Sequence, residues 1–205
     1  MYTNLSKTIA TIASIEVSNE RKEVLQALID YIQPKVVDFK EIRLNFICTH
    51  NSRRSHLSQV WAQTMAHYFG LTQVYCYSGG TEATAMFPKV AETLLNQGFQ
   101  IQVLSEGNNP VYALKYTANG PPIICFSKTF DDVFNPESAF AAIMTCSSAD
   151  QGCPFIAGAE KRLPIRYEDP KIFDHTDVMD SKYLERSIEI AAEMYYVFSQ
   201  FYSLD

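Results

Sequence analysis

Cys48 and Arg54 have the residue types and the spacing that oxyanion chemistry needs. Five residues separate them, and they lie between a short apolar run at 44–47 and an amphipathic segment that starts near Ser55. Between a buried strand and a helix N-terminus, successive backbone N–H groups can turn inward around a tetrahedral oxyanion. The helix dipole and the planar guanidinium of Arg54 add positive potential, which favours the thiolate of Cys48 over its thiol. The pattern predicts a nucleophilic sulfur in an anion-binding loop, with Ser55 placed to donate a hydrogen bond to it.

Two more cysteines lie farther along the chain. Cys146 directly follows the apolar run 140–145, and Cys153 precedes Pro154. Open α/β sheets place their sites beyond the carboxyl ends of the strands, so Cys146 can lie near Cys48. The polar segment between the two later cysteines is short enough to refold if they join. Two buried core thiols are the plain alternative, and the spacing does not suit an ordinary zinc hairpin.

Asp169 follows a further predicted strand at 163–167 and precedes Pro170. An aspartate before proline is commonly a turn or helix cap, and that alternative stays open for Asp169. Cys76 and Cys125 fall inside predicted strands, so we interpret both as core residues.

The net charge requires any anion site to be local. Lys and Arg number 17 against 23 Asp and Glu, a net charge of −6 that argues against general nucleic-acid or membrane-surface binding. With 47% hydrophobic and 13% aromatic residues, the chain can bury a core. Five cysteines, an odd number, predict reduced thiols in a cytoplasmic protein. Neither a signal-peptide pattern nor a run of 18 uncharged apolar residues occurs, so export and membrane spanning are not predicted.

The order of the predicted elements indicates an α/β fold. Apolar periodicity and cap residues predict helices at 18–33, ended by Pro34, and then at 55–70, 88–98 and from about 181. Short apolar runs predict strands at 44–47, 74–77, 140–145 and 163–167, with a Gly79-Gly80 turn after the second. Segments 111–116 and 123–126 flank Asn119-Gly120-Pro121-Pro122 and predict an inserted β-hairpin. Alternating strands and helices imply an open four-stranded parallel sheet with helices on both faces.

The 205 residues favour a single domain with additions. We expect residues 1–41 to form an N-terminal helical extension and residues 108–135 to form the hairpin insertion.

The segment from Cys48 to Ser55, between a strand and a helix, resembles the phosphate-binding loop of the low-molecular-weight protein tyrosine phosphatases and of the arsenate reductases that share their fold. The stretch 77–82 resembles a further part of that family. His50 stands where the family usually has glycine, and Arg53 where it often has a second cysteine. If position 50 needs a positive φ, His50 is strained there; otherwise it is a solvated loop residue.

Cys146, Cys153, Pro154 and the Asp169-Pro170 pair, with their spacings, resemble the thioredoxin-coupled arsenate reductases. The resemblance covers about 42–104 and 139–202, and leaves out the first forty residues and the segment 108–135. It implies an oxyanion site formed by the loop residues Thr49, His50, Asn51, Ser52, Arg53, Arg54 and Ser55.

The resemblance also implies a role for each reactive residue. Cys48 would attack arsenate while Asp169 protonates the departing oxygen. Cys146 would then attack Cys48 and release arsenite, and Cys153 would displace Cys48 to leave a disulfide that thioredoxin reduces. No cofactor is implied. Some reductases of this type hold potassium through an acidic residue, but Gln59 occupies that position here, so no metal is predicted.

Two other functions stay open. A phosphatase would form a phosphocysteine at Cys48 and use Asp169 to activate water; phosphotyrosine enzymes of this fold commonly follow their Asp-Pro with aromatic residues, whereas Lys171-Ile172 follow here. Phe173, Tyr75 or hairpin aromatics could substitute. A non-catalytic oxyanion sensor is the third possibility.

Overall fold

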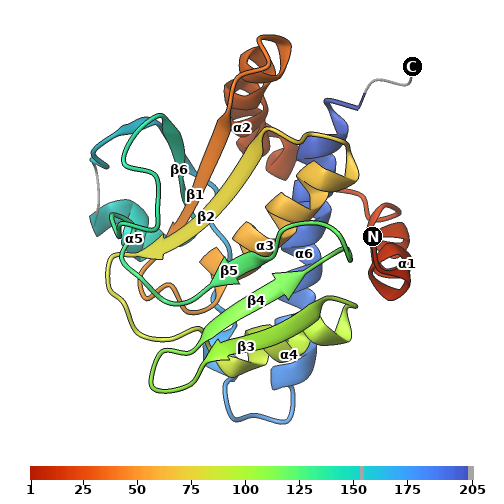
Figure 1. Ribbon diagram of the computed structural model, residues 1–205, viewed down its shortest axis with the longest axis vertical. Helices are drawn as coiled ribbons and strands as arrows, with labels where there is room; N and C mark the ends of the chain where they lie inside the picture. Colours follow the sequence, from red (N-terminus) through yellow and green to blue (C-terminus); the bar gives the residue numbers. More distant parts are fainter. Residues whose placement is uncertain (153–154, 203–205) are drawn as a thin grey trace.

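The computed structural model describes residues 1–152 and 155–202 of the chain (Figure 1). Its helices are α1 (Thr3–Ile12), α2 (Asn19–Val37), α3 (Arg54–Tyr68), α4 (Pro88–Asn96), α5 (Ser147–Gly152), the 3₁₀ helix η1 (Pro170–Phe173) and α6 (Met179–Ser199). Its strands are β1 (Ile42–Cys48), β2 (Val74–Gly80), β3 (Gln100–Ser105), β4 (Val111–Lys115), β5 (Ile123–Cys125), β6 (Phe140–Met144) and β7 (Ala159–Pro164).

The main sheet has four parallel strands in the order β2-β1-β6-β7, which confirms the predicted architecture. β1 is an inner strand with a ladder on each side: Cys48 is in register with Gly80 of β2, and Ile47 with Met144 of β6. The carboxyl ends of these three strands therefore meet at one edge of the sheet. Residues that follow them are brought together, as the sequence predicted.

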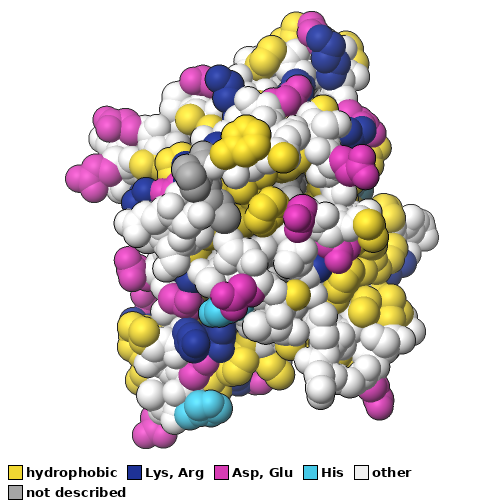
Figure 2. Space-filling view, turned by 90° about the vertical axis from the view of Figure 1, so that its left-hand side faces the viewer, with side chains coloured by type: hydrophobic (Ala, Val, Ile, Leu, Met, Phe, Trp, Pro, Cys, Tyr) yellow, Lys and Arg dark blue, Asp and Glu magenta, His cyan; other side chains and the backbone are white. Residues whose placement is uncertain are grey.

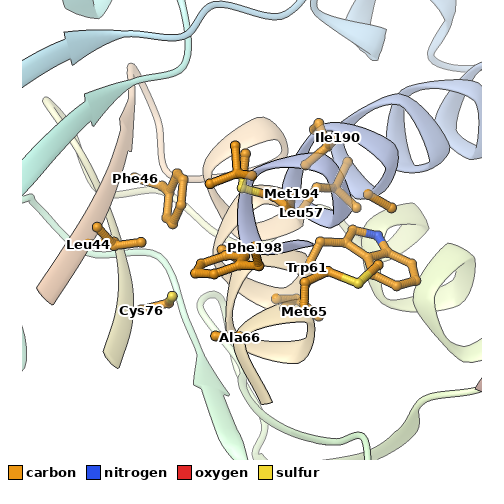
Figure 3. Close-up of a cluster of buried hydrophobic side chains, with 14 of the residues drawn as sticks. Leu44, Phe46, Leu57, Trp61, Met65, Ala66, Cys76, Ile190, Met194 and Phe198 are labelled. Atoms are coloured by element: carbon orange, nitrogen blue, oxygen red, sulfur yellow. The ribbon is translucent and has the colours of Figure 1, made fainter. Parts of the chain in front are cut away.

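Helices cover both faces of this sheet. Figure 3 shows side chains from β1, α3 and α6 meeting in the main core: Leu44, Phe46, Leu57, Trp61, Met65, Ile190, Met194 and Phe198. The opposite face carries a smaller buried cluster in which Ile47, Ala142 and Met144 pack with Ala149 of the short helix α5. The alternation of β6 side chains between the two clusters is the period-two pattern of a strand buried on both faces.

The predicted hairpin is present, but it belongs to a larger element. β4 and β5 pair antiparallel, and β3 adds on the other side of β4 to give a second, three-stranded sheet in the order β3-β4-β5. β3 was not predicted. Its side chains are exposed or half-buried along its whole length, so it lacks the apolar alternation that marks a strand. Pairing with β4, rather than burial, makes this segment extended.

The two longest helices are α2, with 19 residues, and α6, with 21. The prediction that Pro34 ends α2 was wrong, because the helix continues to Val37. Proline removes one N–H donor, but its carbonyl still accepts from Asp38 N–H at 3.0 Å and completes the last turn. In the described part of the chain, no helix combines the length and apolarity needed to cross a bilayer.

Three further parts of the chain differ from the prediction: a helix, a strand and a turn. α1 was missed, although Leu5, Ile9 and Ile12 are buried with helical spacing. The last strand is Ala159–Pro164 rather than 163–167, because this edge strand leaves most of its side chains exposed and only the backbone pairing with β6 defines it. Gly79 and Gly80 end β2 instead of forming a turn.

Candidate active site

Cys48 ends β1, and the five residues before α3 form, with Cys48 and Arg54, what we call the oxyanion loop (residues 48–54). Cys48 is 4% exposed and borders a cavity of about 210 Å³. The described residues that line the cavity are Cys48, Thr49, His50, Ser52, Arg53, Arg54, Ser148, Asp169 and Lys171. The structure thus brings Asp169, which is far away in sequence, to the same hollow as Cys48 and Arg54. Of the predicted oxyanion-binding residues, Asn51 and Ser55 lie behind the cavity wall, fully buried.

The Cys48 sulfur shares a hydrogen bond with Ser55, in which either atom can be the donor. Ser55 Oγ lies 3.1 Å from Cys48 Sγ, and Asn51 Nδ2 donates to the same Ser55 oxygen at 2.8 Å. Because Ser55 Oγ accepts from Asn51, its own hydrogen is free to point at the sulfur. Ser55 is therefore placed to donate to Cys48, as the sequence predicted.

Asn51, and not His50, carries the positive φ of the oxyanion loop, at 43°. Asparagine tolerates this region better than most residues, so the expected strain at His50 does not arise. Asn51 is held there at both ends of its carboxamide, since its Oδ1 also accepts from Lys128 N–H at 3.0 Å. Lys128 and its neighbour Ser127, whose Oγ donates to His50 O at 2.9 Å, therefore support the loop from behind.

Backbone contacts from the end of β2 fix the first half of the loop. Thr81 N–H donates to Cys48 O at 3.1 Å, and Glu82 N–H donates to Thr49 O at 2.9 Å. This close approach explains Gly80, where a Cβ would lie 2.4 Å from Glu82 O and 2.7 Å from Asn51 N. The glycine is needed for packing against the loop and not for a turn.

Gly80→Ala is therefore expected to displace the oxyanion loop. The clash is with backbone atoms, so the variant should lose roughly 2 kcal/mol of folding stability and bind phosphate at least roughly tenfold more weakly than the wild type. Calorimetric titration with inorganic phosphate and urea unfolding measure the two effects. Gly152→Ala is the matched control, because a Cβ there meets nothing within 4 Å. Equal phosphate affinity in the two variants would contradict the expectation.

Arg54 reaches toward Asp169 across the cavity. Its Nη2 lies 2.5 Å from Asp169 Oδ2, and its Nη1 donates to Tyr167 O at 3.1 Å. Asp169 also accepts from Lys171 N–H at 3.1 Å through its other oxygen, so it caps η1 and lines the cavity at once. The cap alternative and the chemical one are compatible, since they use different carboxylate oxygens.

Arg53 directs its guanidinium to Tyr183 of α6 and to Asp174. Its guanidinium donates to Tyr183 Oη and to Asp174 Oδ2, both at 2.5 Å, and stacks 4.2 Å from the Phe87 ring centroid. Burial raises the pKa of the Tyr183 hydroxyl, which keeps it a donor to Asp174. Although Arg53 borders the cavity, these contacts make it an anchor for η1 and α6.

Cys146 lies against the oxyanion loop, as the strand-end rule predicted. Its sulfur is 3.5 Å from Thr49 Oγ1 and accepts from Ala149 N–H at 3.3 Å, and the residue is 1% exposed. Asp150 of α5 pairs with Arg162 at 2.5 Å and with Arg166, which ties this helix to the strand β7 and its continuation. Cys153 and Pro154 lie outside the described residues.

Figure 2 shows the face that carries α5. Acidic and basic side chains are both spread over it, and one group of basic side chains lies beside histidine at the lower left. His50, whose Nδ1 is 3.3 Å from Glu82 Oε2, and Lys171 line the cavity together with Arg53 and Arg54. Positive charge is therefore concentrated locally on a chain of net charge −6, as an anion site requires.

Ser148 and Lys171 also line the cavity and were not predicted from the sequence. Ser148 lies two residues after Cys146, and Lys171 lies two residues after Asp169. Cys76 and Cys125 are buried core residues, and burial raises the pKa of the Cys125 thiol to about 12. Gln59 uses its amide to donate to Cys76 O and Ile124 O, at 3.2 and 3.3 Å.

Behind the loop lie a buried histidine and a buried lysine. Burial, helped by the nearby charge of Lys128, lowers the pKa of His56 to about 3, so the ring is neutral where it meets Ser78 Oγ at 3.2 Å. The Lys128 ammonium lies 4.4 and 5.2 Å from the ring centroids of Phe126 and Phe134, and burial lowers its pKa to about 8.

Lys128 should give the protein a pH-dependent stability. Between pH 8 and its ordinary value of 10.5 the unfolded chain binds more protons than the folded one, so folding stability rises with pH in that window. Relative to Lys128→Met, the wild type should gain about 2 kcal/mol between pH 8 and 10 in urea unfolding. Lys128→Arg, which stays charged, should show no such gain; a pH-independent difference between wild type and Lys128→Met would refute the assignment.

Comparisons with known proteins agree with this geometry. Residues 43–111 match the family model for low molecular weight phosphotyrosine protein phosphatase. Arsenate reductase 2 of Staphylococcus epidermidis is 26% identical over 125 residues, which span 61% of this chain and 76% of that protein.

Two solved structures share the fold. The low molecular weight phosphotyrosine phosphatase of Vibrio cholerae O395 is 12% identical, with a TM-score of 0.51, over 78% of this chain and 95% of that chain. The low molecular weight protein tyrosine phosphatase of T. tengcongensis is 14% identical, with a TM-score of 0.52, over 78% and 99%. Segment 43–111 therefore resembles the low molecular weight phosphotyrosine protein phosphatases, one relative in sequence is an arsenate reductase, and the two solved structures share the fold.

Proposed function

We propose that this protein is a thioredoxin-coupled arsenate reductase. The observation that carries the proposal is the position of Cys146, whose sulfur lies 3.5 Å from Thr49 Oγ1 in the oxyanion loop. A hydrolase of this fold needs one nucleophilic cysteine, and a second sulfur beside the loop adds a way to pass electrons. The curated relative named arsenate reductase supports the same chemistry.

The first step joins arsenic to sulfur. Arsenate enters the cavity, where Arg54 and the backbone N–H groups of the oxyanion loop hold its oxygens. The Cys48 thiolate attacks arsenic(V), and one As–O bond breaks. Asp169, which borders the same cavity, donates a proton to the departing oxygen so that water leaves.

The next steps move two electrons to arsenic. The Cys146 thiolate attacks Cys48 Sγ; the new S–S bond forms as the S–As bond breaks, and its electron pair stays on arsenic, which leaves as arsenite. Two thiols are oxidised to one disulfide as arsenic(V) is reduced to arsenic(III). Cys153 then attacks Cys146 and frees the Cys48 thiolate, and a dithiol of the thioredoxin class reduces the Cys146–Cys153 disulfide.

The lining of the cavity suits a small oxyanion. None of its described lining residues is Phe, Tyr or Trp, and the lining outside the oxyanion loop consists of Ser148, Asp169 and Lys171. Phe173 lines a neighbouring cavity that shares Asp169, and Tyr75 lines a separate cavity beside β2. Neither ring borders the Cys48 cavity, so a phosphotyrosine ring would lack the apolar walls that commonly bind it.

Cysteine pairing after exposure to arsenate tests the proposal. We expect reduced protein incubated with arsenate to release one arsenite per chain and to accumulate a Cys146–Cys153 disulfide, as read by mass spectrometry of peptides from the quenched protein. Added thioredoxin and its reductase should restore the three thiols and allow repeated turnover.

Phosphate in place of arsenate is the control, because it fills the same site but cannot accept these electrons. Its addition should leave all five thiols free. Unchanged thiols and no arsenite after incubation with arsenate would refute the reductase proposal.

The second candidate is a phosphate monoester hydrolase. It is favoured by the placement of Arg54 and Asp169, 2.5 Å apart at the cavity, which would serve phosphocysteine formation and hydrolysis equally well. A small aryl phosphate whose hydrolysis is unaffected by loss of Cys146 would identify this activity. The two activities can be measured on the same sample, so they can be ranked directly.

A further inference from the structure

A partly buried ion pair joins helix α2 to helix α6. Arg21 Nε and Nη2 donate to the two carboxylate oxygens of Glu193, at 2.6 and 2.8 Å. Glu193 lies on α6 and its side chain is 3% exposed, whereas that of Arg21 is 28% exposed. The hydrogen bond from Arg21 to the Glu193 carboxylate raises the pKa of the Arg21 guanidinium, which therefore stays charged. A bidentate pair in this setting fixes both geometry and distance.

Tyr167 is the third member of this cluster. Its hydroxyl donates to Glu193 Oε2 at 2.8 Å, and the Arg21 guanidinium carbon lies 5.3 Å from the centroid of its ring. Tyr167 is 5% exposed. The side chain of Tyr167 is thus held at its ring and at its hydroxyl by Arg21 and Glu193.

The backbone of Tyr167 faces the active site. Its carbonyl accepts from Arg54 Nη1 at 3.1 Å, and its N–H donates to Thr145 O, also at 3.1 Å. Arg54 therefore has two described partners, this carbonyl and the Asp169 carboxylate. The carboxylate is the partner that an incoming oxyanion competes with, whereas the carbonyl remains to orient the guanidinium.

We propose that Arg21 is a positioning residue for Arg54, so that helix α2 forms part of the oxyanion site through Glu193 and Tyr167. The proposal rests on the proposed function in one respect, namely that Arg54 binds the oxyanion. Without Arg21, Tyr167 loses the cation over its ring and Glu193 loses two donors, so the Tyr167 carbonyl is no longer held in one place. The Arg54 guanidinium then meets the oxyanion in a wider range of orientations.

Binding of inorganic phosphate to the full-length protein tests the proposal. We expect Arg21→Met to raise the phosphate Kd roughly tenfold in calorimetric titration, and Arg21→Lys, which keeps the charge but not the bidentate contact, to raise it less. Tyr167→Phe should also raise the phosphate Kd. The double variant Arg21→Met/Tyr167→Phe should bind phosphate no more weakly than the weaker single variant, because both changes remove contacts from the same chain of residues.

Tyr31→Phe is the matched control. It removes another hydrogen bond of α2, from Tyr31 Oη to Glu160 at 2.7 Å, which has no contact with Tyr167 or Arg54. Both it and Arg21→Met should lower Tm, but only Arg21→Met should change the phosphate Kd by more than twofold. The same change in Kd for both variants, or none for either, would overturn the proposal. If Arg21→Met does not fold, Tyr167→Phe decides the question.

The wild-type titration separates this proposal from the proposed function. Wild-type protein that binds neither phosphate nor arsenate would refute both. Wild-type protein that binds phosphate, with Arg21→Met binding equally well, would refute the positioning role alone.

Discussion

Cys48→Ser is expected to reduce arsenate turnover by a factor of roughly 10⁴ or more. A serine hydroxyl is not ionised at neutral pH, even with Ser55 and the helix N-terminus beside it, and it cannot form the disulfide that reduces arsenic. Arsenite release in the presence of thioredoxin and its reductase measures the loss. The phosphate Kd should change little, because Arg54 and the loop amides remain.

Cys76→Ala is the control for Cys48→Ser. Cys76 is also buried, but it lines a different cavity, so its loss should lower stability and leave turnover unchanged. More than about 1% residual arsenate turnover in Cys48→Ser would show that another thiol begins the reaction.

Cys146→Ser should separate the two chemistries by about three orders of magnitude. Arsenate reduction is expected to fall roughly 10³-fold, because no second sulfur remains beside the loop to break the S–As bond. Hydrolysis of a small aryl phosphate, which needs only Cys48, Arg54 and Asp169, should stay within about twofold of the wild type. Both rates are measured on the same preparation.

Cys153→Ser completes this series. A single turnover should then stop at a Cys48–Cys146 disulfide, with one equivalent of arsenite released. If Cys146→Ser reduced arsenate as fast as the wild type, the relay as proposed would be wrong, whatever the rate of phosphate hydrolysis.

The inner strands of the parallel sheet could be predicted because each has a local sequence pattern. The runs 44–47 and 140–145 are apolar except for Asn45 and Thr145, as is typical of strands buried on both faces, and the helices between them have one apolar face. β3 and β7 could not be found in this way. Their side chains are largely exposed, and pairing with β4 and β6 defines them, which is information from distant parts of the chain.

The candidate site, like the sheet, could be predicted only in part from the sequence. The neighbourhood of Cys48 and Cys146 followed from the topology, since both residues leave adjacent parallel strands. Lys128 and Tyr167 could not be linked to the site from sequence, because both reach it through backbone atoms. Almost every residue has the same backbone N–H and C=O, so the residue type does not indicate these contacts. Only the structure shows that Lys128 and Tyr167 hold Asn51 and Arg54.

The first half of the outer edge of β2 is covered by a side chain, whereas residues 128–130 bond to its carboxyl end at Gly80. Gln63 of α3 accepts from Cys76 N–H at 2.9 Å and donates to Val74 O at 3.0 Å, so one carboxamide satisfies two of the backbone groups that a neighbouring strand would use. An uncovered edge of this kind is a template for pairing with another molecule. Gln63 thus protects the protein from edge-to-edge self-association, and its loss would favour aggregation without touching the chemistry of the oxyanion loop.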